Sequence, residues 1–516
     1  MKNIIRLFTL GLVVLSTSSC EKFLDKPKPI VESPFDGVAS STAGLDASLT
    51  AAWAWWTSPQ VAVGNLILYP ELMSDYVRAT TQARGRLTRV YQKDLQSEGY
   101  DLIGEVTQRA SRAVNLANFI IHSGRKNLVK DAAWVTNKNR VMGEAYFLRG
   151  WMNFEYALMM GDQWNTKNLG ANATALGPLI RFTPVLQPED LANARTPLKA
   201  AYDSIIVDLQ RAEAMIPIAF DPAIHDPSFR PRANRFAASA MLARVYWQQN
   251  NFDKTLEQIN KVIGSTPGVS SFPLASNFND IYRRTGITTT TNSTTKGEVI
   301  LEYVAAAPTR ISTRSGQPID NVWTRSGQIM AYFSTYFRNL VNFDLVNDRR
   351  YRELINPTFS QTLGGVAHTG WATRKFPTDV NLVFIRSAEL LLMRAEIFAR
   401  KNLIADALRD LNLVRNRATI GNFNTTNQQV LIAEIITERA RELHAEGYRS
   451  HELKRLGSLT DGEPGEVRFL KGDRVSPQFD CGTLGFGCED MKWNNRRLTF
   501  LVTNDELQIN PLANNP

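Results

Sequence analysis

One spacing of small and large side chains occurs twice in the chain and constrains the fold more than any other feature. In residues 243–262 and again in residues 395–414, five small or apolar residues follow one another at steps of 3, 9, 4 and 3. Steps of three and four keep side chains on one face of a helix, so each set marks the facing sides of two consecutive helices. The two sets are Ala243, Tyr246, Thr255, Ile259 and Val262, and Ala395, Phe398, Ala407, Leu411 and Val414.

These offsets are typical of the tetratricopeptide helix pair, in which a small residue on the first helix lets the second helix approach. The aromatic residue one turn later fills the space between the helices. Polar turns follow the first helix in both sets, at residues 250–253 and 400–403. We therefore predict two such helix pairs, with two unrelated amphipathic pairs as the alternative. A third pair is predicted from residues 144–160 and 202–216, separated by an insertion rich in glycine, proline and asparagine.

The first twenty residues resemble a bacterial lipoprotein signal. Two basic residues precede an apolar run over residues 7–15, which is too short to span a bilayer. Small residues then lead directly to Cys20. We expect residues 1–19 to be removed, Cys20 to be lipidated, and residues 20–36 to tether the body of the protein to a membrane. An ordinary secretory peptide cleaved elsewhere is the alternative.

The charge balance argues against a nucleic-acid partner. Lys plus Arg exceeds Asp plus Glu by 59 − 50 = 9, and these charges are spread along the chain without a basic block. A hydrophobic content of 43% is ordinary for a globular protein and excludes a disordered or collagenous chain. Only three cysteines are present, which excludes a small disulfide-built domain. Outside the cytoplasm we expect a disulfide between Cys481 and Cys488, with two free thiols as the alternative.

The rest of the chain divides into helical and loop-rich segments. Residues 37–263 and 381–457 show helical periodicity. Residues 264–380 contain clusters of Thr, Ser, Gly and Pro with short apolar runs, which indicates loops with a few strands, and residues 458–516 are similar. Because long loops on a rigid scaffold commonly bind ligands, we place the ligand-binding region in residues 264–380.

Three glutamates near the C-terminal end of the helical part need an explanation. Glu438, Glu442 and Glu446 are spaced at i, i+4 and i+8, so on one helix face their like charges would repel. We predict an internal ion network that fixes helix packing. The alternative, a pair of carboxylates for glycoside hydrolysis, would flank an open cleft. The arginines that could form ion pairs with these glutamates are Arg439, Arg441 and Arg449 nearby, and Arg415 and Arg417 from the preceding helix pair.

The chain shows no motif for catalysis or metal binding. Of its five histidines none forms HExxH. His444 and His451 are seven residues apart on one predicted helix face, but no third ligand accompanies them, so we expect packing or surface roles. GxSxG, P-loop and GxGxxG sequences are absent. We therefore expect no enzyme activity, no cofactor and no bound metal.

Several stretches resemble the SusD/RagB-like outer-membrane lipoproteins of the Bacteroidetes. Residues 143–162 (GEAYFLRGWMNFEYALMMGD) are similar to a long helix of that family that ends in a Gly-Asp turn. Residues 235–263 and 386–418 are similar to its two best-marked helix pairs. The most specific match is TERARELHAEGYRSHELKRLG at residues 437–457, and the tail at residues 506–516 is also similar.

This resemblance implies both a fold and a function. The implied fold is predominantly α, a SusD-like scaffold of tetratricopeptide-like helix pairs with a loop-rich ligand-binding region and minor β structure, in which residues 37–516 form one unit. The implied function is that of a cell-surface lipoprotein of the outer membrane, which binds oligosaccharide and delivers it to a SusC-like TonB-dependent transporter without altering it. The alternatives are a peptide ligand, an adaptor whose helical groove contacts only proteins, and a glycoside hydrolase.

The ligand-binding residues implied by the resemblance are defined by position rather than by a motif. Binding a neutral sugar needs flat apolar faces for stacking and nearby hydrogen-bonding groups. In the family such residues come from the segment after the first helix and from central loops. The candidates in the corresponding parts of this chain are Asp75, Arg78, Arg84, Tyr282, Trp323, Tyr332 and Trp371.

Overall fold

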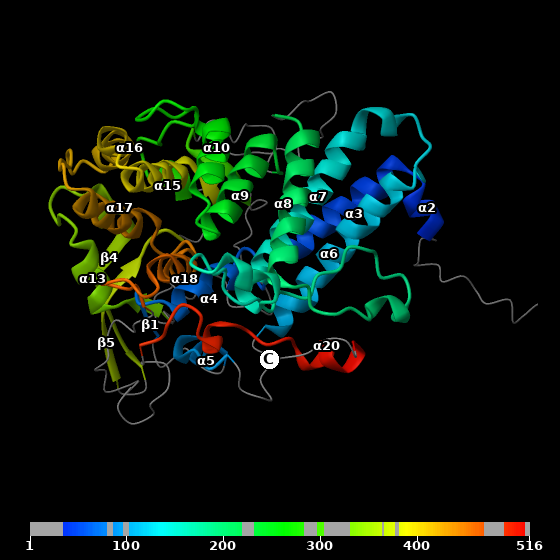
Figure 1. The fold of residues 1–516 in the computed structure, drawn as a ribbon, viewed down its shortest axis with the longest axis horizontal. Helices are drawn as coiled ribbons and strands as arrows, with labels where there is room; N and C mark the ends of the chain where they lie inside the picture. Colours follow the sequence, from blue (N-terminus) through cyan, green and yellow to red (C-terminus); the bar gives the residue numbers. More distant parts are fainter. Residues whose placement is uncertain are drawn as a thin grey trace, which may run out of the picture.

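The structure, a computed structural model, is a predominantly helical body with two small sheets (Figure 1), which confirms the predicted fold class. It describes residues 35–79, 86–95, 103–218, 232–282, 297–303, 331–363, 366–376, 381–468 and 490–510. The first half contains α2 (Phe35–Ala39), α3 (Thr42–Trp56), α4 (Asn65–Met73), β1 (Val77–Ala79), α5 (Arg86–Gln92), α6 (Gly104–Arg125), α7 (Ala133–Met160), η1 (Leu169–Ala173), η2 (Pro188–Leu191), α8 (Leu198–Met215), α9 (Arg235–Gln248) and α10 (Phe252–Ile263).

The second half mixes strands with helices. It contains α11 (Asn279–Tyr282), β2 (Val299–Tyr303), β3 (Ala331–Phe333), α13 (Thr335–Val341), α14 (Arg349–Leu354), β4 (Ile355–Leu363), β5 (Val366–Thr373), β6 (Leu382–Arg386), α15 (Ser387–Arg400), α16 (Ile404–Arg417), α17 (Gln428–Leu443), α18 (Arg449–Thr460), η5 (Arg496–Leu498) and α20 (Asn504–Ile509). The described part of residues 264–380 therefore holds most of the strands and several short helices.

The predicted helix pairs are present. Helix α9 packs on α10 and α15 packs on α16, with Ala243 and Ala395 fully buried in the two first helices. Both turns use a left-handed asparagine, Asn250 with φ 54° and Asn402 with φ 60°, a conformation that commonly ends a helix. The third predicted pair is α7 with α8, which make extensive contact. Gly150 permits their close approach, since a Cβ there would lie 2.8 Å from Cγ of Leu209.

Two antiparallel sheets are formed by segments that are far apart in the sequence. The larger sheet has the strand order β1-β3-β5-β4, and the smaller one pairs β2 with β6. Strand β1 follows α4 directly, and its residues 77–79 pair with residues 331–333 of β3. The β4–β5 hairpin completes this sheet at one side of the molecule (Figure 1). This pairing brings the segment after the first helices next to the loop-rich region.

The C-terminal segment returns to the first half of the chain. The Phe500 amide donates to the carbonyl of Met159 at the end of α7, with N and O 2.8 Å apart. Asn193 and Asn510 exchange two hydrogen bonds, from the Asn193 amide to Oδ1 at 2.9 Å and from Nδ2 of Asn510 to the Asn193 carbonyl at 2.8 Å. In Figure 1, α20 therefore lies near the lower end of α6. The end of the chain is thus part of the wall around α6 and α7.

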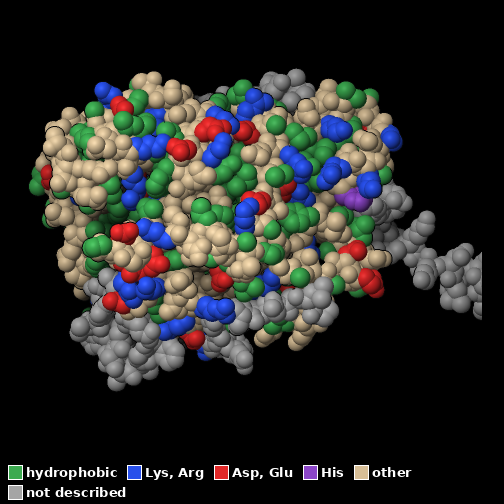
Figure 2. Space-filling model, in the orientation of Figure 1, with side chains coloured by type: hydrophobic (Ala, Val, Ile, Leu, Met, Phe, Trp, Pro, Cys, Tyr) green, Lys and Arg blue, Asp and Glu red, His purple; other side chains and the backbone are tan. Residues whose placement is uncertain are grey.

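The surface carries both signs of charge. On the face shown in Figure 2, Lys and Arg are interspersed with Asp and Glu. Within the described ranges, no helix is both long enough and apolar enough to cross a bilayer. The predicted signal peptide and Cys20 lie outside the described residues.

Candidate functional site

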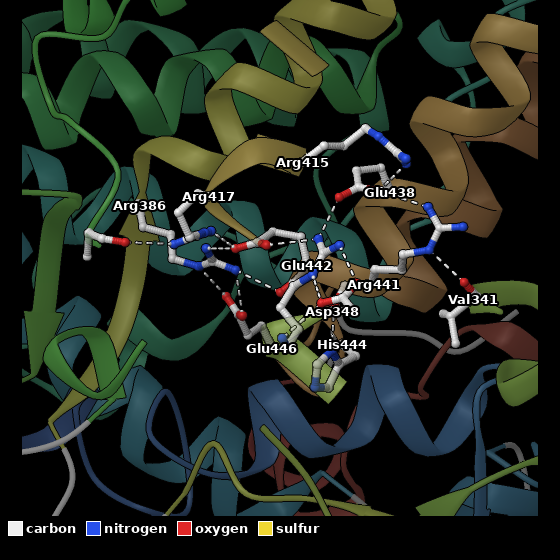
Figure 3. Close-up of polar contacts among 12 residues, drawn as sticks. Val341, Asp348, Arg386, Arg415, Arg417, Glu438, Arg441, Glu442, His444 and Glu446 are labelled. Atoms are coloured by element: carbon white, nitrogen blue, oxygen red, sulfur yellow. Dashed lines mark hydrogen bonds and ion pairs between the residues drawn. The ribbon is translucent and has the colours of Figure 1, made fainter. Parts of the chain in front are cut away.

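The predicted acidic stripe lies at the centre of a buried ion network (Figure 3). Glu438 and Glu442 project from α17 and are 0% and 1% exposed. The prediction of a single helix face is wrong for Glu446, because α17 ends at Leu443. A left-handed residue, Ala445 with φ 62°, turns the chain there. The Glu446 carboxylate nevertheless joins the other two carboxylates in the network.

Two arginines bridge the three glutamates. Nη1 of Arg350 lies 2.6 Å from Oε1 of Glu438 and 3.2 Å from Oε2 of Glu442. Nη1 of Arg386 lies 2.6 Å from Oε1 of Glu442, and its Nη2 lies 2.8 Å from Oε1 of Glu446. Arg350 comes from α14 and Arg386 from the end of β6, so the network joins α17 to a short helix and to the small sheet.

Further partners complete the network. Nζ of Lys375 lies 2.6 Å from Oε1 of Glu446. Arg417 on α16 pairs with Glu442, and its Nη1 lies 2.9 Å from Oε2 of Glu298 at the start of β2. Glu298 also pairs with Arg386 at 2.7 Å. Each of these charges is therefore matched by an opposite charge within hydrogen-bonding distance, which is what burial of an ion requires.

The other predicted arginines divide between two clusters. Arg415 and Arg441 both contact Glu438, with N–O distances of 3.4 Å and 2.8 Å. Arg439 instead lies 2.7 Å from Glu452 on α18. Arg449 also contacts Glu452 rather than the three glutamates, so its place in the predicted stripe network is corrected.

The electrostatics of the network are those of fixed charges. Burial alone would raise the pKa of Glu442, but Arg417, Arg386 and Arg350 hold it well below its ordinary value. Burial is also outweighed at Glu446, where Arg386 and Lys375 lower the pKa to about 2. A catalytic acid for glycoside hydrolysis has a raised pKa beside an open cleft. These carboxylates show the opposite shift, Glu438 and Glu442 are buried, and the side chain of Glu446 is only 6% exposed, so the network is architectural.

Sequence reasoning missed half of this network. Arg350, Lys375 and Glu298 come from the segment predicted to be loops with a few strands. Arg386 stands at the first residue of the predicted helix pair of residues 386–418, where the structure has the end of β6. No periodicity links these four residues to α17. One signal was available. Arg386 ends the apolar strand LVFIR directly before α15, and a charge at the end of a buried strand needs a buried partner.

Asp75 is corrected from a ligand-binding candidate to an internal partner. Its carboxylate is 2% exposed and receives two hydrogen bonds from Arg449, from Nε and Nη2, each 2.8 Å long. The Arg449 guanidinium also lies over the ring of Tyr76, 4.3 Å from its centre. With its oxygens held in this way and no exposed surface, Asp75 is not available to a ligand.

Tyr282 is corrected in the same way. Its ring is buried, and its hydroxyl donates to Oε1 of Glu446 at 2.8 Å. Nζ of Lys375 and the guanidinium of Arg386 lie 5.2 Å and 5.9 Å from the ring centre. Tyr282 therefore belongs to the ion network.

Arg78 and Tyr332 are brought together by the larger sheet. They face each other in the β1–β3 register, and the guanidinium of Arg78 lies 5.6 Å from the Tyr332 ring centre. Tyr332 is only 3% exposed and contacts the rings of Phe359 and His368. We therefore correct Tyr332 to a packing residue, whereas Arg78 is half-buried at the edge of this cluster.

Trp371 is the predicted candidate whose ring is both described and partly exposed. Because Ala372 packs with Tyr332, its neighbour Trp371 points to the other face of the sheet. The Trp371 ring lies 5.1 Å from Tyr351 and 6.2 Å from Phe343, between ring centres. The guanidinium of Arg338 lies 6.0 Å from the Trp371 ring centre. Aromatic packing therefore fixes the tryptophan while a polar cation borders it.

Several predicted positions lie outside the described residues. These are Arg84, Trp323, Cys20, Cys481 and Cys488. Within the described ranges, no group of three or more His, Cys, Asp or Glu side chains is placed to hold a metal ion. His444 is buried among Phe333, Phe337 and Phe343.

Two family models match separate parts of the chain. The model described as "SusD family" matches residues 319–498, and the model described as "Starch-binding associating with outer membrane" matches residues 108–247. A curated relative, SusD-like protein P2 of Formosa agariphila, is 23% identical over 259 residues. That match covers 50% of this chain and 46% of the relative, so it spans about half of the relative's length.

Solved structures share the fold over nearly the whole chain. A SusD superfamily protein from Bacteroides thetaiotaomicron is 18% identical with a TM-score of 0.73, covering 92% of this chain and 99% of that one. A putative sugar binding protein from Bacteroides vulgatus is 19% identical with a TM-score of 0.70, covering 92% and 98%. A SusD-like carbohydrate binding protein from the same species is 17% identical with a TM-score of 0.70, covering 92% and 97%.

Proposed function

The chain belongs to the SusD/RagB-like family, and from this membership we propose that it is a cell-surface lipoprotein that binds oligosaccharide and passes it to a SusC-like TonB-dependent transporter. The ligand leaves unchanged, so the protein is a binding protein rather than an enzyme. The family model that matches residues 108–247 is described by starch binding and by association with the outer membrane, which supports both the ligand class and the location.

The observation that carries the ligand class in this chain is the setting of Trp371. A sugar ring stacks its C–H face on a flat aromatic ring and needs polar groups at the rim. Trp371 offers a partly exposed indole that Tyr351 and Phe343 hold in place, with Arg338 beside it. Arg78 on β1 of the same sheet remains a proposed ligand contact, as do Arg84 and Trp323, which lie outside the described residues.

The proposed lack of catalysis rests on the charge network. Glu438 and Glu442 are buried, the side chain of Glu446 is 6% exposed, and all three are paired with arginines. The pKa of Glu446 is lowered to about 2. Neither property suits an acid that must give up a proton near neutral pH. We therefore propose that these glutamates hold the helices together while the loops and the sheet bind the ligand.

Binding of neutral oligosaccharides tests this proposal directly. Titration calorimetry with a panel of plant and bacterial oligosaccharides should identify a ligand, and Trp371→Ala should weaken its binding roughly tenfold because the stacking surface is lost. The matched control is Phe423→Ala, since Phe423 is also a partly buried aromatic with an arginine, Arg415, 5.7 Å from its ring centre. Equal affinities in both variants and the wild type would contradict the assignment of Trp371.

A thermal-shift assay with peptides and sugars tests the choice between a glycan and a peptide ligand. A thermal shift caused by peptides, with no response to any sugar, would replace the glycan by a peptide ligand. The anchor and the transporter are tested in cells. We expect acylation at Cys20 by mass spectrometry and co-purification with an outer-membrane barrel protein, and expect Cys20→Ala to lose the acyl group and the membrane fraction.

A further inference from the structure

A pocket on the other side of the molecule from the larger sheet has the properties of a second binding site. It lies between α6, the end of α7, the loop after η1 and the C-terminal segment. Its volume is about 490 Å³, within the roughly 300–1,000 Å³ that is usual for small-molecule sites. In Figure 1, α6 and α20 lie well apart from the β4–β5 hairpin. We call it the α6–α7 pocket, defined by Ser111, Asn118, Asn153, Tyr156, Arg181 and Glu506.

Asn153 on α7 is the unusual member of this pocket. Its side chain is 1% exposed, and neither its Oδ1 nor its Nδ2 has a hydrogen-bond partner within the part of the chain that the structure describes. A buried amide without partners is costly to stability. Such a group calls for an explanation, and a bonding partner from outside the chain, such as a water molecule, an ion or a ligand, is one.

Asn118, another asparagine that lines the pocket, has protein partners for both atoms of its amide. It is also 1% exposed, but its Oδ1 accepts a hydrogen bond from Nη1 of Arg149 at 2.9 Å. Its Nδ2 donates to the carbonyls of Arg181 and Thr183 at 3.0 and 3.1 Å. Asn118 therefore closes the loop onto α6, while Asn153, which also lines the pocket, has no partner for either amide atom among the described residues.

The surroundings of Asn153 indicate an uncharged ligand. Arg181 and Glu506 form an ion pair across the pocket, so their charges cancel. The hydroxyls of Tyr156 and Ser111 lie 3.4 Å apart and can each donate or accept. Aliphatic side chains, including Val114, complete the wall. The other two charged residues of the lining, Arg112 and Asp505, are of opposite sign, so the lining carries no net charge. The pocket thus combines apolar surface with neutral hydrogen-bonding groups and balanced charges.

We propose that the α6–α7 pocket binds a neutral polyhydroxylated molecule of one or two sugar rings. Adjacent hydroxyls of a sugar present one donor and one acceptor side by side, which matches the Oδ1 and Nδ2 of Asn153, and the ring C–H groups match the aliphatic wall. The proposal relies on the proposed function for the class of ligand but places it at a second site that does not involve Trp371.

The test combines a variant with a probe inside the pocket. Met160 lines the pocket, so in protein labelled with ¹³C-methyl methionine its methyl resonance reports on occupancy. We expect glucose, galactose, xylose, maltose or cellobiose to shift the Met160 signal. Asn153→Leu should weaken this binding at least about tenfold through loss of the amide, with no fall in melting temperature. Asn260→Leu on α10 is the control, because its Oδ1 also lacks a partner but lies outside the pocket.

Two results would overturn the proposal. One is a Met160 signal that none of these sugars shifts, which can be measured in the wild-type protein even if Asn153→Leu does not fold. The other is equal sugar affinity in wild type and Asn153→Leu. The proposed function fails separately. If Trp371→Ala abolishes oligosaccharide binding while no sugar shifts the Met160 methyl resonance, only the pocket proposal is contradicted. If Met160 shifts and Trp371→Ala has no effect, the pocket stands and the sheet assignment falls.

Discussion

The ion network on α17 and the α6–α7 pocket bury polar groups in opposite ways. In the network, Glu438, Glu442 and Glu446 each meet at least one cation within 3 Å. In the pocket, Asn153 is as deeply buried as Glu442, yet its side-chain Nδ2 and Oδ1 have no hydrogen-bond partner among the described residues. Polar groups that are fully partnered hold the fold, whereas one left open has its bonding capacity free for a ligand. Burial alone therefore does not distinguish scaffold from site. The hydrogen-bond partners of the buried group and its place beside a cavity must be known as well.

The largest expected effect comes from breaking the network. Glu442→Gln leaves Arg350, Arg386 and Arg417 buried with one counter-charge fewer, and we expect it to lower the free energy of unfolding by about 3–5 kcal/mol. Urea unfolding followed by circular dichroism measures this loss. The control is Glu463→Gln, which removes a glutamate whose side chain is 56% exposed in its pair with Lys167 and should change little. Equal stability of the two variants would show that the network does not hold the helices.

The next largest effect is a loss of folding stability at low pH. The pKa values of Glu446 and Glu396 are lowered from 4.5 to about 2, because Arg386 and Lys375, and Arg455 and Arg400, outweigh the cost of burial. A lowered folded pKa stabilises the protein above the unfolded value and loses that stability as pH falls toward the folded value. Each carboxylate should therefore contribute about 3 kcal/mol that disappears between pH 4.5 and 2.

Unfolding free energies measured from pH 6 down to pH 2.5 test this window. Glu446→Gln should flatten the slope below pH 4.5, since the variant has one titrating group fewer. A wild-type protein whose stability does not fall in this range would show that these carboxylates are not ionised partners in the fold.

The smallest effect compares the two asparagines of the pocket. Asn118→Leu removes the acceptor of Arg149 and the donor to two loop carbonyls, so we expect a loss of about 1–3 kcal/mol. Asn153→Leu removes no protein hydrogen bond and should leave stability equal or slightly higher. Thermal unfolding of both variants decides this contrast. A larger loss for Asn153→Leu would give that amide a structural role and end the comparison.

Local patterns in the sequence were enough to predict the helical scaffold. The repeated offsets at Ala243 and Ala395 reflect contacts between neighbouring helices, and such contacts leave a periodic trace within a short window. The spacing of Glu438 and Glu442 likewise predicted that cationic side chains must pair with them. Arg415 and Arg417 lie close enough in the sequence to be predicted as such partners.

The remaining partners could not be predicted because they come from distant segments. Arg350 and Arg386 reach Glu442 across 92 and 56 residues, and pairing over such separations leaves no period in the sequence. Asp75 and Tyr282 were misassigned for the same reason. A polar or aromatic residue beside a loop looks available to a ligand until its internal partner, Arg449 or Glu446, is known.

The unpartnered amide of Asn153 could have been noticed in the sequence. Asn153 interrupts an apolar stretch of the longest described helix, GWMNFEYALMM, where each neighbour is expected to be buried. A single amide side chain in such an apolar run either hydrogen-bonds to another part of the protein or binds a ligand. The sequence does not reveal which, because the nearest walls of the pocket come from α6 and from residues 502–509.

The bond between Asp75 and Arg449 joins residues 374 positions apart. During synthesis the acidic partner emerges early, and its arginine follows only when most of the chain has left the ribosome. Until then the first helices carry an uncompensated carboxylate that resists burial. A chain that ends before Arg449 would therefore leave the Asp75 carboxylate without its buried partner, so the first helices depend on the last quarter of the sequence to complete their packing.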